Sequence, residues 1–67
     1  MLPRVTIHHS AREEHWAVGF KAVQAYFAEG LQHSGQAKAW DGFTHGGQHF
    51  EVKVWRRRNT VHVKVYG

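Results

Sequence analysis

Residues 50–66 have the sequence FEVKVWRRRNTVHVKVY, which decides the fold expected for this 67-residue chain. On both sides of the three arginines, apolar residues alternate with polar or aromatic ones. Alternation with a period of two residues predicts two β-strands that share one apolar face. We therefore expect an antiparallel hairpin with valines on one face and Lys, His, Trp and Tyr on the other.

The loop of this hairpin decides which residues face each other, and the alternation is compatible with two loop lengths. A two-residue turn at Arg58-Asn59 would set Lys53 opposite Lys64 and point Arg56 toward the apolar face, and both arrangements are unfavourable. A four-residue loop over 56–59 avoids them, so we predict the longer loop. It pairs Val54 with Val61, Val52 with Val63, Phe50 with Val65, Glu51 with Lys64, Lys53 with His62, and Trp55 with Thr60.

An amphipathic helix is expected upstream of the strands. It would begin at Ala11 and run for about 19 residues. Ser10 and Glu13 fit a capping box at its start, and Gly30 followed by Leu31 fits a cap at its end. The apolar stripe predicted to pack on the sheet consists of Trp16, Phe20, Val23 and Phe27.

The remaining segments complete one small α+β domain spanning residues 1–67. Leu2–His9 alternates and predicts a first strand, and Pro3 suits an edge position. A short strand over 40–45 would enter a hairpin at Gly46-Gly47. The expected architecture is one N-terminal strand, one amphipathic helix, and an antiparallel two- to three-stranded meander with the helix on one face.

Composition favours an anionic partner and excludes several classes of protein. The chain has 9 Lys+Arg against 5 Asp+Glu, a formal net charge of +4, seven His and no Cys. Without Cys, thiol catalysis and Cys-containing zinc sites are excluded. No apolar run is long enough for a membrane span and no signal peptide is recognisable, so we expect a cytoplasmic protein that acts on no membrane.

The face of the hairpin away from the helix is the candidate binding surface. Exposed rings can stack on bases while Lys and Arg neutralise phosphates, as single-stranded nucleic-acid binding requires. Protonation of exposed histidines would strengthen binding to an anion as pH falls through about 6.5. The candidate residues for binding nucleic acid or a partner are Arg56, Arg57, Arg58, Lys53, Lys64, Trp55, Tyr66 and His62.

Several alternatives stay open beside a nucleic-acid-binding module. Trp55 and Tyr66 would, in a purely structural interpretation, serve only as cross-strand packing. A small basic chain would also suit a protein-binding inhibitor or adaptor of the kind encoded by phages and mobile elements, acting on a host protein complex that handles nucleic acid. Edge strands or the open face would then supply a homodimer or an augmented sheet.

Catalysis and metal binding are not expected. No catalytic motif or small-molecule site is recognisable, and a metal-independent ribonuclease built on His45, His49 and Lys53 is only a minor alternative. His8 and His9 are neighbours on a strand and point to opposite faces, which leaves only His45 and His49 able to converge. We therefore predict a binding protein that has no catalytic residues, no cofactor, no metal and no small-molecule substrate.

Overall fold

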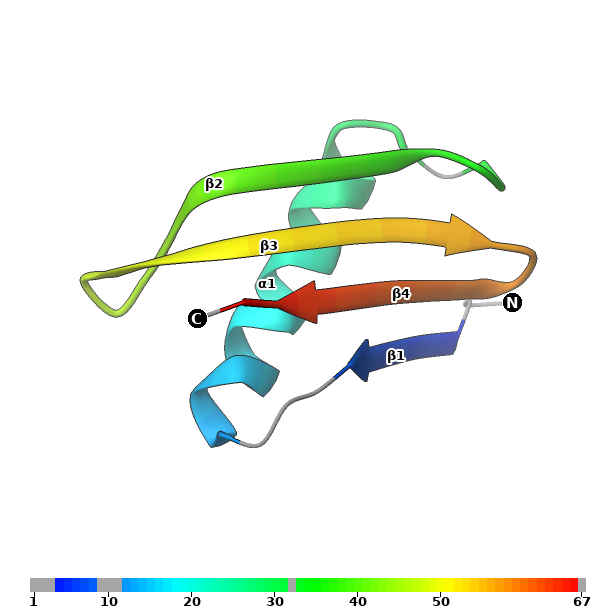
Figure 1. Cartoon of the computed structure of the whole chain (residues 1–67). Coiled ribbons are helices and arrows are strands. Elements are labelled where there is room, and N and C mark those ends of the chain that lie inside the picture. Colours follow the sequence, from blue (N-terminus) through cyan, green and yellow to red (C-terminus); the bar gives the residue numbers. More distant parts are fainter. Residues whose placement is uncertain (1–3, 9–11, 32, 67) are drawn as a thin grey trace.

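A computed structural model describes residues 4–8, 12–31 and 33–66, which form one helix and four strands (Figure 1). The elements are β1 (Arg4–His8), α1 (Glu13–Ala28), β2 (Ala37–His45), β3 (Gln48–Arg57) and β4 (Thr60–Val65). They make a single sheet with the order β1-β4-β3-β2. The α+β class is thus confirmed, whereas the arrangement differs in detail from the predicted one, because the sheet is mixed and three strands follow the helix.

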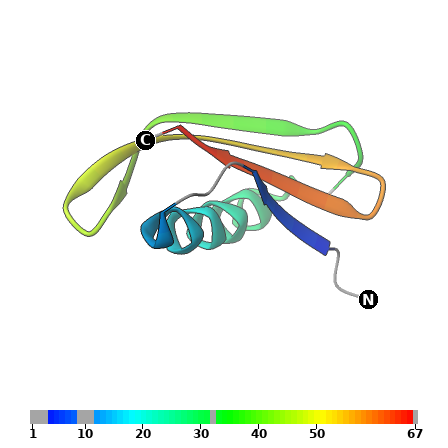
Figure 2. The ribbon, with the colours of Figure 1, turned by 60° about the horizontal axis from the view of Figure 1, so that its bottom comes forward.

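The helix packs on one face of the sheet, and no described segment covers the other face (Figure 2). α1 connects β1 at one edge of the sheet to β2 at the other edge. β1 therefore lies next to β4, the last strand of the chain, and pairs with it in parallel. The sequence analysis did not predict this parallel pairing. Within the described residues, no helix is both long and apolar enough to span a membrane.

The predicted register of the β3–β4 hairpin is wrong, because the loop is the two-residue turn Arg58-Asn59. Lys53 therefore faces Lys64, and Arg56 faces Val61 on the helix side. The observed pairs are Val52 with Val65, Lys53 with Lys64, Val54 with Val63, Trp55 with His62, Arg56 with Val61, and Arg57 with Thr60. Three local contacts offset part of the cost of this register: each of the two lysines lies over an aromatic ring, and Arg56 Nε–H donates to the Arg58 carbonyl at 3.0 Å.

The helix is rotated relative to the predicted stripe. Trp16 and Phe20 are 48% and 51% exposed, whereas Val18, Ala22 and Tyr26 are fully buried. The reason is a close approach at Gly19, where a Cβ atom would lie 3.1 Å from Ile7 Cδ1. At this point of closest approach the helix presents a glycine, so the neighbouring Trp16 and Phe20 lie outside the contact, whereas Val23 and Phe27 of the predicted stripe do pack against the core.

The two ends of the helix differ in how well they were predicted. The helix begins at Glu13 rather than Ala11 and has 16 residues, with Arg12 at the N-cap. Ser10, the predicted cap, lies outside the described residues. The C-terminal cap is confirmed, since Gly30 has φ 80° and Leu31 N–H donates to the Tyr26 carbonyl at 3.2 Å. This hydrogen-bonding pattern is a Schellman motif.

The β2–β3 hairpin turns at Gly46-Gly47 as predicted, and both glycines have positive φ, as the tight turn requires. β2 is longer than the predicted segment and carries a bulge between Trp40 and Phe43. The bulge lets Trp40 and Phe43 both pack against the core. The buried core consists of Val18, Ala22, Val23, Tyr26, Phe50, Val52, Val54, Val61, Val63 and Val65.

Candidate nucleic-acid interface

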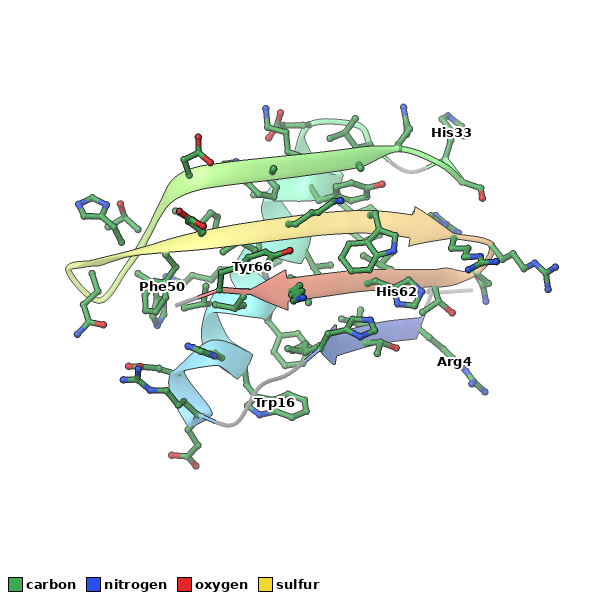
Figure 3. All side chains as sticks on the ribbon, in the orientation of Figure 1. Arg4, Trp16, His33, Phe50, His62 and Tyr66 are labelled. Carbon is green, nitrogen blue, oxygen red and sulfur yellow. The ribbon has the colours of Figure 1, made fainter. Side chains whose placement is uncertain are left out.

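The sheet face opposite α1, called the open face here, gathers most of the predicted binding residues. Its side chains alternate with the buried valines, which face the helix. From β3 come Lys53, Trp55 and Arg57, and from β4 and the residue after it come His62, Lys64 and Tyr66. Figure 3 shows Tyr66 and His62 on this face, at different points along β4.

Three rings stack at the centre of the open face and form what we call the ring cluster: His8, Trp55 and His62. The ring of Trp55 lies 5.2 Å from that of His62 and 5.5 Å from that of His8, centroid to centroid, with interplanar angles of 10° and 20°. His8 Nε2 and His62 Nδ1 share a hydrogen bond of 2.8 Å. One imidazole must donate and the other accept, so at least one of the two is neutral.

Burial lowers the pKa of His62 below its usual 6.5, and the neighbouring His8 and Arg57 lower it further. Both causes disfavour the charged imidazole. His62 therefore serves the open face at neutral pH as a neutral ring that supports Trp55, not as a cation.

Next to the ring cluster, Lys53 and Lys64 form a pair of like charges directly opposite each other. Lys53 Nζ lies 5.7 Å from the centroid of the Trp55 ring, and Lys64 Nζ lies 5.0 Å from that of Tyr66. The cation–π contacts offset part of the repulsion, because the faces of the rings carry negative potential. Because Trp55 and Tyr66 lie on opposite sides of the pair along the strands, the two ammonium groups extend toward opposite ends of the open face.

A recess of about 390 Å³ opens beside Trp55, on the side away from His62. Ala37 pairs with Trp55 across β2 and β3, so only a methyl group stands next to the indole there. Lys53 and Arg57 also line the recess. Arg56 lines the recess as well, so the lining includes one aromatic ring and three cationic residues. The volume lies within the range of small-ligand sites.

The three arginines separate in space. Only Arg57 lies on the open face, whereas Arg58 occupies the turn with φ 57° and its N–H donates to Ser34 Oγ at 3.2 Å. Arg56 points to the helix side, near Tyr26. Burial raises the pKa of Tyr26, and the positive charge of Arg56 offsets part of this rise. Of the arginine loop predicted as one basic finger, Arg57 therefore belongs to the open face, Arg58 to its edge, and Arg56 to the opposite side.

The far end of the open face is acidic. Glu51 lies beside Tyr66, whose N–H donates to the Glu51 carbonyl at 2.8 Å. A smaller recess of about 170 Å³ there includes Asp41, Glu51 and Tyr66 in its lining. Lys53 also lines this recess and Lys64 Nζ lies over the Tyr66 ring, so lysines stand beside the carboxylates here, and Arg57 adds positive charge at the end that holds the ring cluster.

Sequence reasoning missed two residues of this surface, His8 and Arg4. Both belong to β1, whose register sets Arg4 beside Thr60 and His8 beside Lys64 on the open face. The alternation in β1 assigned them to one face. Only the crossover of α1 and the parallel pairing bring that face beside β4.

The histidines considered for metal binding or catalysis do not converge. His45 pairs with Gln48 on the helix side, whereas His49 pairs with Thr44 on the open side, with a contact of 3.2 Å between Thr44 Oγ1 and His49 Nδ1. The part of the chain that the structure describes holds no group of three or more potential metal ligands. The two histidines of the ribonuclease hypothesis are therefore on opposite faces.

Comparison of the chain with models of protein families, with curated proteins and with solved structures gives no match in any of the three.

Proposed function

We propose that the open face binds single-stranded nucleic acid, without catalysis. The observation that carries the proposal is the Lys53–Lys64 pair, two like charges facing each other on an uncovered surface with an aromatic ring beside each. Like charges directly opposite each other destabilise a sheet. Phosphates bound at Lys53 beside Trp55 and at Lys64 beside Tyr66 would neutralise both charges and remove that repulsion.

The order of groups along the strands matches the alternation of base and phosphate. Trp55 lies opposite His62, the lysine pair follows two residues further along β4, and Tyr66 comes two residues after that. From His62 to Tyr66 the strand spans about 13 Å at about 3.3 Å per residue. One base would stack on Trp55 in the recess over Ala37, a phosphate would lie at the lysines, and a second base would stack on Tyr66.

An uncovered sheet face with exposed rings favours single strands over duplex. Stacking on Trp55 and Tyr66 needs unpaired bases, because the base faces of a duplex are already occupied. The proposed partners are nucleic acid, or a nucleic-acid-handling complex that presents it, and a second copy of the chain. The cytoplasmic location expected from the sequence stays a prediction.

The test is fluorescence anisotropy with labelled single-stranded and duplex oligonucleotides of equal length at low salt. We expect binding to the single strands, weakened about 5- to 150-fold by Trp55→Ala and much less by Trp55→Phe, since each stacked base contributes about 1–3 kcal/mol. Lys53→Gln should weaken binding, whereas Lys21→Gln, on the exposed side of α1, should not.

The proposal fails if the wild-type protein shows no binding tighter than about 100 μM at low salt, which is weaker than ordinary non-specific association. It also fails if Lys21→Gln and Lys53→Gln have equal effects. In either case a capture experiment with and without nuclease tests the inhibitor or adaptor alternative, because a directly bound protein survives nuclease treatment.

A further inference from the structure

β1 is an edge of the sheet whose outer side carries unpaired backbone groups. In the described part of the chain, β1 has β4 on one side and no strand on the other. Arg4 N–H donates to the Asn59 carbonyl, so backbone groups of Arg4, Thr6 and His8 point toward β4. Those of Val5 and Ile7 point outward because the direction alternates along a strand, and such a row is a template for another strand.

Exposed apolar side chains flank this edge. Val5 is 37% exposed, and on the adjoining helix Trp16 and Phe20 are 48% and 51% exposed. Gly19, between them in the sequence, lies against Ile7, which places this part of α1 at β1. In the view of Figure 3, Trp16 lies near the C-terminal end of β1. At about 150–250 Å² for a whole aromatic side chain, each ring leaves roughly 100 Å² for burial by a partner.

The opposite edge of the sheet is poorly suited to pairing. β2 is interrupted by the bulge between Trp40 and Phe43, and it carries Lys38 and Asp41. Bulges and charges are the features by which natural edges avoid added strands. β1 has no break in its register with β4 over Arg4–His8.

We propose that two copies of the chain associate through antiparallel pairing of their β1 strands, with Thr6 on the two-fold axis. This register makes each Val5 face Ile7 of the other copy. The outward N–H and C=O groups of these residues then form four hydrogen bonds across the axis. It also brings the apolar side chains of Val5 and Ile7 together on the helix side, next to the exposed rings of α1.

Charge complementarity favours a second copy as the occupant. α1 begins with Glu13 and Glu14, five and six positions after the C-terminal end of β1 at His8. Antiparallel pairing brings the opposite end of the other β1 to this point, with Arg4 and the neighbouring turn that holds Arg58. Glu14 forms an ion pair with Arg12 at the N-cap, so Glu13 is the carboxylate of each helix start that approaches the basic end of the other sheet.

The axis runs perpendicular to the sheet, so the two open faces lie on the same side of one eight-stranded sheet. Two ring clusters would then flank the axis, since His8 belongs to β1 itself. The proposed dimer does not depend on nucleic acid, so its formation is measured in the absence of nucleic acid.

The chain has no Cys, so single-cysteine variants report proximity directly. In the proposed register, Thr6 faces Thr6 of the other copy as a non-hydrogen-bonded pair with Cα atoms about 4.5 Å apart, within the range that a disulfide spans. We expect Thr6→Cys to form a covalent dimer quickly under mild oxidation. The matched control is Thr44→Cys, an exposed threonine on the other edge strand, which should cross-link far more slowly.

Sedimentation equilibrium without nucleic acid, from about 5 to 500 μM protein at pH 8, gives the second measurement. We expect the wild-type mass to rise reversibly from 7.7 kDa toward twice that value, and Phe20→Glu to stay monomeric. Tyr66→Glu removes an equally exposed ring from the open face and should dimerise normally. A wild-type monomer at all concentrations, or equal cross-linking of Thr6→Cys and Thr44→Cys, overturns the proposal and leaves the oligonucleotide test unaffected.

Discussion

His62 is the residue through which pH acts on this fold. Its pKa is lowered by burial first, then by His8 and Arg57. The unfolded chain therefore takes up a proton at His62 at a higher pH than the folded chain does, and stability is lost as pH falls below about 6.5. We expect Tm to decrease over this range and His62→Gln to flatten the decrease, measured by circular dichroism at constant ionic strength.

The control for His62 is His33→Gln, since His33 is exposed and makes no contact with the ring cluster in the described structure. A pH profile altered equally by both substitutions would contradict the assignment to His62.

Arg58 holds a backbone conformation that suits glycine. Its φ of 57° falls in the left-handed region, where a side chain costs about 1–2 kcal/mol. Arg58→Gly should therefore raise the free energy of unfolding by up to about 1 kcal/mol, because the relief is partly offset by glycine's greater freedom in the unfolded chain. Arg57→Gly, at a strand position with no positive φ, should lower it. Urea denaturation distinguishes the two, and a loss of stability in both variants would contradict the argument.

At the scale of elements, the rotation of α1 gives opposite expectations for two aromatic residues on the helix. Tyr26 is fully buried and its hydroxyl donates to the Gln36 carbonyl at 2.7 Å, whereas Phe20 is half exposed. Tyr26→Ala should cost about 3–5 kcal/mol, enough to unfold a domain of this size. Phe20→Ala should cost about 1 kcal/mol or less at low protein concentration. Equal losses of Tm would indicate that the predicted stripe, not the observed one, packs on the sheet.

The elements themselves follow from the sequence, but their mutual orientation does not. Alternation in 50–66 predicts strands because every second side chain is buried, and Gly30 predicts the helix end because its positive φ is local. The helix face depends on the distance to the sheet, which is set by the contact of Gly19 with Ile7. The hairpin register depends on whether the ring contacts of Lys53 and Lys64, and the hydrogen bond of Arg56, offset the cost of placing two lysines opposite each other. A prediction that considers only the charges of facing residues leaves these contacts out.

For the whole molecule, alternation correctly places Lys53, Trp55, His62, Lys64 and Tyr66 on one face, since parity is the same in either register. It also places Arg57 there and Arg56 on the other side, which the description of a single basic loop overlooked. His8 and Arg4 were missed because their position depends on the crossover of α1, a property of the fold and not of β1.

This division of the arginines makes a prediction about the salt dependence of nucleic-acid binding. Removing one cation that neutralises a phosphate of a single strand reduces the slope of log affinity against log salt by about 0.7. Arg57 lines the recess beside Trp55 from the open face, so Arg57→Gln should reduce the slope by about this amount. Arg56 also borders the recess, but it alternates onto the helix side and its Nε–H is engaged with the Arg58 carbonyl. Arg56→Gln removes the same charge from the same loop and should lower stability while leaving the slope unchanged. Anisotropy titrations from about 25 to 200 mM salt measure both variants against the wild type. If the two slopes fall equally, the chain binds by net charge alone, and the open face has no special part in binding.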